Sequence, residues 1–275
     1  MNRFHALFPN GKPLIGMIAL SPSPGYPAFT SIDAMIETAL ADLSALERGG
    51  ADAVLVENDF DQPHTLTAGP AVVAAMTRVT REVVARARVP VGIEVLLNDW
   101  RASLAVAATT GARFVRLDFF VDRVRSKLGV IEPEPAAVVT YRRRIRADHL
   151  LLFTDLQVKY STPVGAPKPI ERSALEAAAA GADAVIVTGS ATGIGPTPVD
   201  LIAARVGGVP VLIGSGMSAD NAAELVPLAD GFIVGTSLRS GSQASDRVVE
   251  ARIRTVVGAI RKAENGSKSS QDETT

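Results

Sequence analysis

Short apolar runs recur along the chain, and each is followed by an alanine-rich segment with the periodicity of a helix. Eight runs predict strands, at residues 14–20, 53–57, 91–96, 113–118, 150–155, 184–188, 209–214 and 231–235. The segments that follow them predict helices near residues 31–48, 70–87, 100–110, 134–147, 170–180, 197–206, 218–227 and 245–263. Such regular alternation is typical of parallel βα units. The pattern therefore predicts an α/β protein with one parallel sheet.

The even spacing of these eight units favours a closed (β/α)8 barrel over an open, doubly wound sheet. No Gly-x-Gly-x-x-Gly pattern follows the first predicted strand, and no long insertion separates two units. Gly50, Gly111 and Gly181 stand between a helix and the next strand, where glycine can take the left-handed conformation of a tight turn. We predict one barrel over residues 1–263 and a disordered polar tail over 264–275.

Composition narrows the classes of partner and chemistry. The 28 basic and 29 acidic residues nearly cancel and are interspersed, so the chain lacks the basic surface expected of a nucleic-acid-binding protein. The absence of cysteine excludes disulfides, thiolate metal sites and a cysteine nucleophile. No signal peptide and no apolar run of membrane-spanning length is found, so we predict a cytoplasmic protein without a transmembrane segment. We also expect a homo-oligomer.

Ionisable side chains stand at the carboxyl ends of the second to fifth predicted strands, which is the end that carries function in such barrels. They are Glu57 with Asn58, Glu94, Arg116 with Asp118, and Asp155 followed by Gln157 and Lys159. Alternate positions of a strand share a face, so this set is expected to point into the barrel mouth. Crowded carboxylates supply acid–base groups, or their oxygens hold Mg²⁺, and the sequence leaves both open. A single carboxylate could instead cap a helix or pair with Arg116.

Two further side chains at this end have alternative interpretations. Lys159 could form a Schiff base, but its place in a polar loop favours an electrostatic clamp on an anionic substrate. His64 is the one histidine placed for acid–base work, although a solvated loop histidine is the favoured interpretation.

The loops after the sixth to eighth predicted strands are rich in glycine and hydroxyl side chains. They contain the run 188–193, with Thr188, Gly189 and Gly193, then Gly214, Ser215 and Gly216, and finally Gly235 and Thr236. Glycine lets backbone amides approach a ligand, and barrels bind phosphate at the loops after strands seven and eight. These loops therefore predict a binding site for a small phosphorylated substrate.

A family resemblance rests on motifs spread over nearly the whole chain. They are residues 15–18, the segment 49–52 leading to 56–58, residues 154–159, the run 188–193, residues 214–217, and 229–231 leading to 234–238. Through them the chain resembles the BtpA/SgcQ family, which looks like aldolase-type, ribulose-phosphate-binding barrels. The chain departs from the family pattern where Ala19 and Tyr160 replace histidines, so its substrate or reaction is expected to differ.

The resemblance implies two roles: a photosystem I assembly factor in photosynthetic relatives, and an enzyme of sugar or nucleoside metabolism in others. An assembly factor gives no reason to keep charged groups at many strand ends, so we favour the enzyme. We predict action on a phosphorylated sugar or ribosyl compound by a lyase, an isomerase or, favoured among these, an enzyme that cleaves a bond at a ribosyl phosphate. The alternative scaffold role predicts an exposed apolar patch and no ligand in the barrel mouth.

Overall fold

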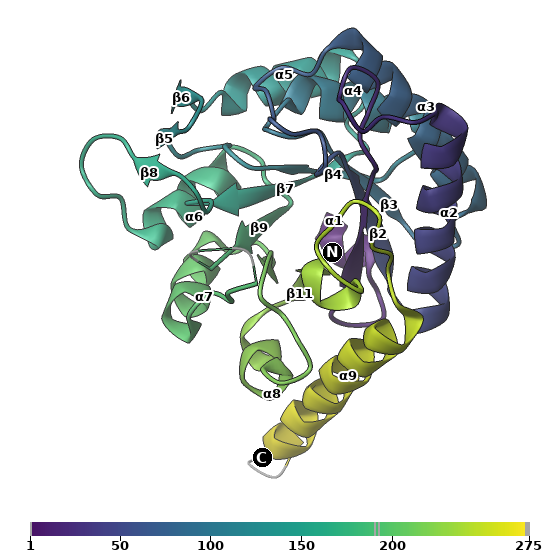
Figure 1. Ribbon diagram of the computed structural model, residues 1–275. Coiled ribbons are helices and arrows are strands. Elements are labelled where there is room, and N and C mark those ends of the chain that lie inside the picture. Colours follow the sequence, from purple (N-terminus) through teal and green to yellow (C-terminus); the bar gives the residue numbers. More distant parts are fainter. Residues whose placement is uncertain (1, 190, 192, 273–275) are drawn as a thin grey trace.

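The computed structural model describes residues 2–189, 191 and 193–272, and its centre is a closed barrel of eight parallel strands. In Figure 1 the strands form a central ring with the helices around them. The strands are β1 (Leu14–Ala19), β2 (Ala53–Glu57), β3 (Val91–Glu94), β4 (Phe114–Leu117), β7 (Leu151–Leu156), β9 (Ala184–Val187), β10 (Val211–Ile213) and β11 (Gly231–Val234). Strand β11 closes the ring on β1, with Phe232 opposite Leu14. The (β/α)8 prediction is confirmed.

Helices alternate with the barrel strands and cover the outside of the ring. They are α2 (Ile32–Gly49), α3 (Pro70–Arg86), α4 (Trp100–Thr110), α5 (Pro135–Arg144), α6 (Ile170–Ala179), α7 (Pro198–Ala204), α8 (Ala222–Leu225) and α9 (Glu250–Asp272). Gly50, Gly111 and Gly181 have φ values of 94°, 91° and 94°. The predicted glycine turns therefore connect these helices to the next strands. No helix within the described ranges is long and apolar enough to cross a membrane.

Two of the predicted helices end early and pass into 3-10 helices. The helix expected near 197–206 ends early, and its last turn becomes the 3-10 helix η1 (Arg205–Gly207). The helix expected near 218–227 is reduced to α8, and η2 (Val226–Leu228) follows it directly. A proline at position 227 removes a backbone donor, which favours a tight turn over a longer α-helix.

The half of the barrel interior near the amino ends of the strands is filled with apolar side chains. The rings of Phe114 and Phe153 stack with centroids 4.7 Å apart. A Cβ atom on Gly92 would lie 2.0 Å from the Phe114 ring, so glycine makes room for it. The short helix α1 (Arg3–Leu7), which the sequence did not predict, adds the fully buried Phe4 to this cluster. The N-terminus accordingly lies within the ring in Figure 1.

A small antiparallel sheet joins two loops beside the barrel mouth. Its strands are β5 (Val124–Ser126), β6 (Gly129–Ile131) and β8 (Thr162–Pro163), in the order β6-β5-β8. The first two form a hairpin in the loop after β4, and β8 lies in the loop after β7. Strands of two or three residues carry too little periodicity to be recognised from sequence. The sheet fixes both loops relative to the cavity described below.

The C-terminal polar segment 264–275 follows directly from the barrel's last helix, α9. Helix α9 continues through the first part of it to Asp272, and residues 273–275 lie outside the described residues. Glu264 anchors the start of this segment, since its carboxylate accepts a hydrogen bond from the Lys12 amide at 2.9 Å and pairs with Arg261 at 3.0 Å. The contacts of Glu264 tie helix α9 to the barrel just past residue 263, where the apolar periodicity ends and the sequence predicts the end of the helix.

Candidate functional site

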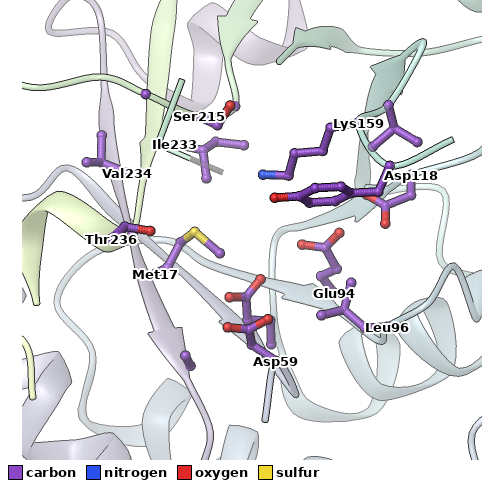
Figure 2. Close-up of a pocket in the computed structure, with 18 of the residues that line it drawn as sticks. Met17, Asp59, Glu94, Leu96, Asp118, Lys159, Ser215, Ile233, Val234 and Thr236 are labelled. Atoms are coloured by element: carbon purple, nitrogen blue, oxygen red, sulfur yellow. The ribbon is translucent and has the colours of Figure 1, made fainter. Parts of the chain in front are cut away.

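A cavity of about 1090 Å³ opens at the carboxyl ends of the barrel strands. The predicted site residues in its wall are Glu57, Glu94, Arg116, Asp118, Lys159, Gly193, Gly214, Ser215, Gly216, Gly235 and Thr236. In Figure 2, Glu94 and Asp118 lie across the cavity from Thr236, and the Lys159 side chain extends into the space between them. Charged groups from β2 to β7 thus face a wall that follows β9 to β11 and is neutral up to Arg239 at its edge.

Glu57 and Glu94 form a buried carboxyl pair. They are direct partners in the register of β2 and β3, so their side chains lie side by side on the inner face. Burial, reinforced by Asp59, raises the pKa of Glu57 to about 8, and burial also raises the pKa of Glu94 well above its ordinary value. Because burial and their mutual repulsion disfavour two charged carboxylates at this place, the pair retains a proton at neutral pH.

Arg116 lies beside this pair and is fixed by Asp155. Its Nε and Nη2 donate to the two carboxylate oxygens of Asp155 at 2.8 and 2.9 Å, and its Nη1 lies 3.5 Å from Glu94 Oε2. Burial opposes the charge of Arg116, but Asp155 and Glu94 outweigh it and raise its pKa. Burial raises the pKa of Asp155 to about 6, against the effect of Arg116. Asp155 lies outside the cavity wall, so it positions Arg116 within the site.

The protonation of Glu57 makes stability depend on pH. Because its folded pKa lies above its unfolded value, the folded chain binds more protons than the unfolded chain between roughly pH 4.5 and 8. Stability therefore falls as pH rises through this window, by at most about 1.4 kcal/mol per pH unit for this group. We expect Glu57→Gln to remove this dependence, so that the variant gains stability relative to the wild type from pH 5 to pH 9. Urea unfolding across that range measures the difference, and a constant difference would contradict a protonated Glu57.

Asp118 and Lys159 complete the charged side, but they reach it in different ways. Asp118 directly follows β4 and continues its alternation. Strand β7 ends at Leu156, and Gln157 has a φ of 47°, so the alternation predicted to extend to residue 159 is interrupted. The exposed Gln157 side chain donates to the Lys168 carbonyl oxygen at 2.7 Å, away from the cavity. Lys159 nevertheless lines the cavity, because the turn brings the chain back.

The neutral side offers backbone donors. The 3-10 helix η3 (Thr236–Leu238) follows β11, and the first N–H groups of a helix lack partners within it. Among the described residues, the N–H groups of Gly216, Thr236 and Ser237 donate to no protein acceptor. The Ser215 hydroxyl, in contrast, accepts from the Gly189 amide at 3.3 Å and donates to the Ile194 carbonyl at 3.1 Å. A ligand at this wall would meet backbone amides first.

Three predicted binding residues stand outside the cavity wall. Asn58 is 2% exposed, and its amide accepts from the Leu96 N–H at 2.8 Å and donates to Asp61 at 3.0 Å. It therefore fixes the loops after β2 and β3. Gly189 packs against the backbone of its own loop, where an added Cβ would lie 2.2 Å from Ile194 O. Thr188 has a buried hydroxyl without a partner among the described residues.

Part of the predicted phosphate loop cannot be compared with the structure. Ser190 and Thr192 in the run 188–193 lie outside the described residues. The described loop after β10 shows why it needs glycine where it approaches the loop after β9. A Cβ on Gly216, which has a φ of 74°, would lie 2.0 Å from the Gly195 nitrogen, so the two loops touch through their backbones.

His64 is buried, so the expectation of a solvated loop histidine is wrong. Its side chain lines the cavity and is 8% exposed. The Gln62 side-chain amide donates to the Asp59 carbonyl and lies 2.8 Å from His64 Nε2, which makes Nε2 the acceptor. The proton then sits on Nδ1, a buried atom without a hydrogen-bond partner in the described chain. Burial lowers the pKa of His64, so the ring is neutral near pH 7.

Sequence reasoning missed several residues of the cavity wall. Asp59 follows Glu57 by two positions and was not assigned a role, although the same strand-end argument could have found it. Lys127 and Ser126 come from the small sheet that the sequence did not reveal. Arg239 lies in the wall after η3, with no sequence signal that distinguishes it. Ala19 and Tyr160, the two departures from the family pattern, both line the cavity.

The carboxylates do not form a ready metal site. Within the described ranges, no group of three or more histidine, cysteine or acidic side chains has the arrangement to hold a metal ion. Asp155 and Glu94 both face the Arg116 guanidinium, which competes with a cation for their oxygens. These donors do not fit the Mg²⁺ alternative.

Known proteins resemble this chain in sequence over nearly its whole length. The model of the BtpA family matches residues 10–262. An uncharacterised protein of Archaeoglobus fulgidus is 36% identical over 253 residues, covering 91% of this chain and 99% of that protein. The photosystem I biogenesis protein BtpA of Synechocystis is 34% identical over 264 residues, covering 92% of this chain and 89% of that protein.

Among solved structures, the N-(5'-phosphoribosyl)anthranilate isomerase of Pyrococcus furiosus has a TM-score of 0.57 and 14% identity. The match covers 91% of this chain and 99% of the isomerase chain. At this identity the likeness shows a shared barrel fold.

Proposed function

The chain belongs to the BtpA family, and we propose that it is an enzyme acting on a phosphorylated sugar or ribosyl compound at its barrel mouth. The observation that carries this proposal is the pairing of a proton-holding carboxyl group with an amide-rich wall across one cavity. A substrate with a phosphate at one end and a reactive sugar carbon at the other matches these two sides. The structural neighbour named as a phosphoribosylanthranilate isomerase supports a phosphoribosyl substrate.

The charged side supports acid–base chemistry. Glu57 holds a proton at neutral pH and can donate it to a leaving group, while Asp118 lies in the same wall and can accept a proton. Arg116 and Lys159 would offset the negative charge of the substrate. Cleavage at the anomeric carbon is the reaction we favour. The bond to the leaving group breaks, that group takes the Glu57 proton, and water adds to the carbon and gives its proton to Asp118. A lyase or an isomerase would use the same side chains.

Ligand titration tests the phosphate requirement. We expect ribose 5-phosphate to raise the melting temperature of the chain by roughly 5 °C at one hundred times its Kd, and ribose to leave it unchanged. Differential scanning fluorimetry measures both, with and without Mg²⁺, over a panel of phosphorylated sugars and nucleotides. If no phosphorylated compound stabilised the chain, the proposal would be refuted. A shift in melting temperature seen only with Mg²⁺ would support the alternative in which the site binds this metal.

A role in assembly is the second candidate, and one observation favours it. The side chains of Leu175, Val199, Ile202 and Val206 are each at least 51% exposed on α6, α7 and η1, which pack together on the barrel exterior. Such grouped apolar side chains often mark a protein interface. The Synechocystis relative named for photosystem I biogenesis is compatible with that role. The two candidates differ in the titration above, because an assembly role alone requires no ligand in the cavity.

A further inference from the structure

Arg239 is a buried cation at the edge of the neutral wall. It follows η3, is only 5% exposed, and lines the cavity. Its Nη2 donates to the carbonyl oxygens of Gln243 and Asp246 at 2.7 and 2.8 Å, which holds the back of the guanidinium against its own loop. The ring of Phe60 lies 5.0 Å from Cζ. The side chain is therefore fixed in place before any ligand binds.

The other half of the guanidinium has unused binding capacity. Nη1 is buried and has no hydrogen-bond partner in the part of the chain that the structure describes. No carboxylate among these residues lies within ion-pair distance of Arg239, although Asp42 and Asp59 act on it from farther away. Burial, reinforced by Arg247, lowers the pKa of Arg239. A buried guanidinium with a free donor and no close counterion is costly unless an anion completes it.

The surroundings of Arg239 favour a phosphate group as that anion. The unpartnered N–H groups of Thr236 and Ser237 belong to the same short segment and the same cavity wall. Phosphate oxygens bind a guanidinium and backbone amides together through charge-assisted hydrogen bonds. The only other guanidinium in the described wall, that of Arg116, already binds Asp155 through two hydrogen bonds. Unlike Arg116, Arg239 has no carboxylate within ion-pair distance in the described chain, so a bound anion would be its first close counterion.

We infer that Arg239 is the charged anchor of a phosphomonoester site, in which Nη1 binds one phosphate oxygen and the amides of Thr236 and Ser237 bind another. This inference rests on the proposed function and assigns its phosphate to the loop after β11. The ligand then extends from Arg239 across the cavity toward the Glu57–Glu94 pair. A purely structural Arg239, which only holds the loop through Nη2, would leave ligand affinity unchanged when that loop is kept in place.

Calorimetric titration of the full chain with ribose 5-phosphate and with inorganic phosphate tests the inference. We expect Arg239→Gln, which keeps donors toward the two carbonyls but loses the charge, to weaken binding about 10- to 100-fold. Arg239→Lys should bind more tightly than Arg239→Gln and show a steeper loss of affinity with added salt. Arg252→Met serves as the matched control, because Arg252 donates to the Arg239 carbonyl oxygen from outside the cavity wall. The affinity of Arg252→Met for both probes should stay within about twofold of that of the wild type.

The outcomes separate this inference from the proposed function. Wild-type binding together with unchanged affinity in Arg239→Gln would overturn the anchor role and leave the proposed function standing. Equal losses of affinity in Arg239→Gln and Arg252→Met would assign the effect to the loop and would also overturn it. If Arg239→Gln does not fold, the comparison of Arg239→Lys with the wild type decides, and unchanged affinity and salt dependence count against the inference. A wild type that binds neither probe would refute both proposals.

Discussion

Replacing Glu57 by glutamine is expected to lower the turnover of a phosphorylated substrate by about 10²- to 10⁴-fold, the range contributed by a general acid. Glutamine keeps the size and hydrogen-bonding capacity of the protonated side chain but has no proton to transfer. Since Glu57 holds its proton at neutral pH beside Glu94, the substitution mimics its charge state and spares the fold. Steady-state kinetics should show the loss in kcat, with KM changed much less.

Glu47→Gln is the matched control for this experiment. The Glu47 side chain is also largely buried, at 8% exposure, but it lies on α2 outside the barrel and pairs with Arg88. The turnover of Glu47→Gln should equal that of the wild type. If Glu57→Gln retained activity within a few-fold of the wild type while its melting temperature was unchanged, the acid would have to be another group. Glu94 would then be the first candidate, because burial also raises its pKa well above the ordinary value.

The fold could be predicted from the chain because the dominant signal is repeated eight times. Buried parallel strands read as short aliphatic runs, and the glycines at 50, 111 and 181 mark the turns between helix and strand. Elements without such repetition escaped prediction. Helix α1 has only five residues, and its importance lies in Phe4, which reaches a core built by residues far along the chain. The sheet of β5, β6 and β8 depends on the same kind of distant contact.

The strand ends predict which charged side chains lie at the cavity, whereas the roles of individual residues stay predictions. Alternation correctly brings Glu57, Glu94 and Arg116 to the cavity, since each stands on or at the end of a strand with regular geometry. It fails at Gln157, where the backbone leaves the extended region. Alternation also does not reveal that Asp155 pairs with Arg116, because this ion pair depends on the register between the neighbouring strands β4 and β7. Burial of Arg239 and His64 is likewise set by tertiary packing.

The ion pair between Arg116 and Asp155 leads to the second large effect. Asp155→Asn should lower the free energy of unfolding by about 3–5 kcal/mol, because it leaves a buried guanidinium without its two-bond partner. The neighbouring Glu94 cannot replace Asp155, since its Oε2 lies 3.5 Å from Nη1 and its pKa is raised by burial. For a chain of this length the loss corresponds to roughly 10 °C in melting temperature. Urea unfolding at pH 7.5 measures it directly.

A double substitution separates the stability of the pair from its use in the site. Arg116→Met with Asp155→Leu removes both charges and fills a similar volume, so we expect it to recover most of the lost stability. It should not recover affinity for a phosphorylated ligand, because Arg116 lines the cavity. If Asp155→Asn lost less than about 1 kcal/mol, the guanidinium would have to find another acceptor. If the double variant stayed as unstable as Asp155→Asn, the loss would come from packing rather than from an unpaired charge.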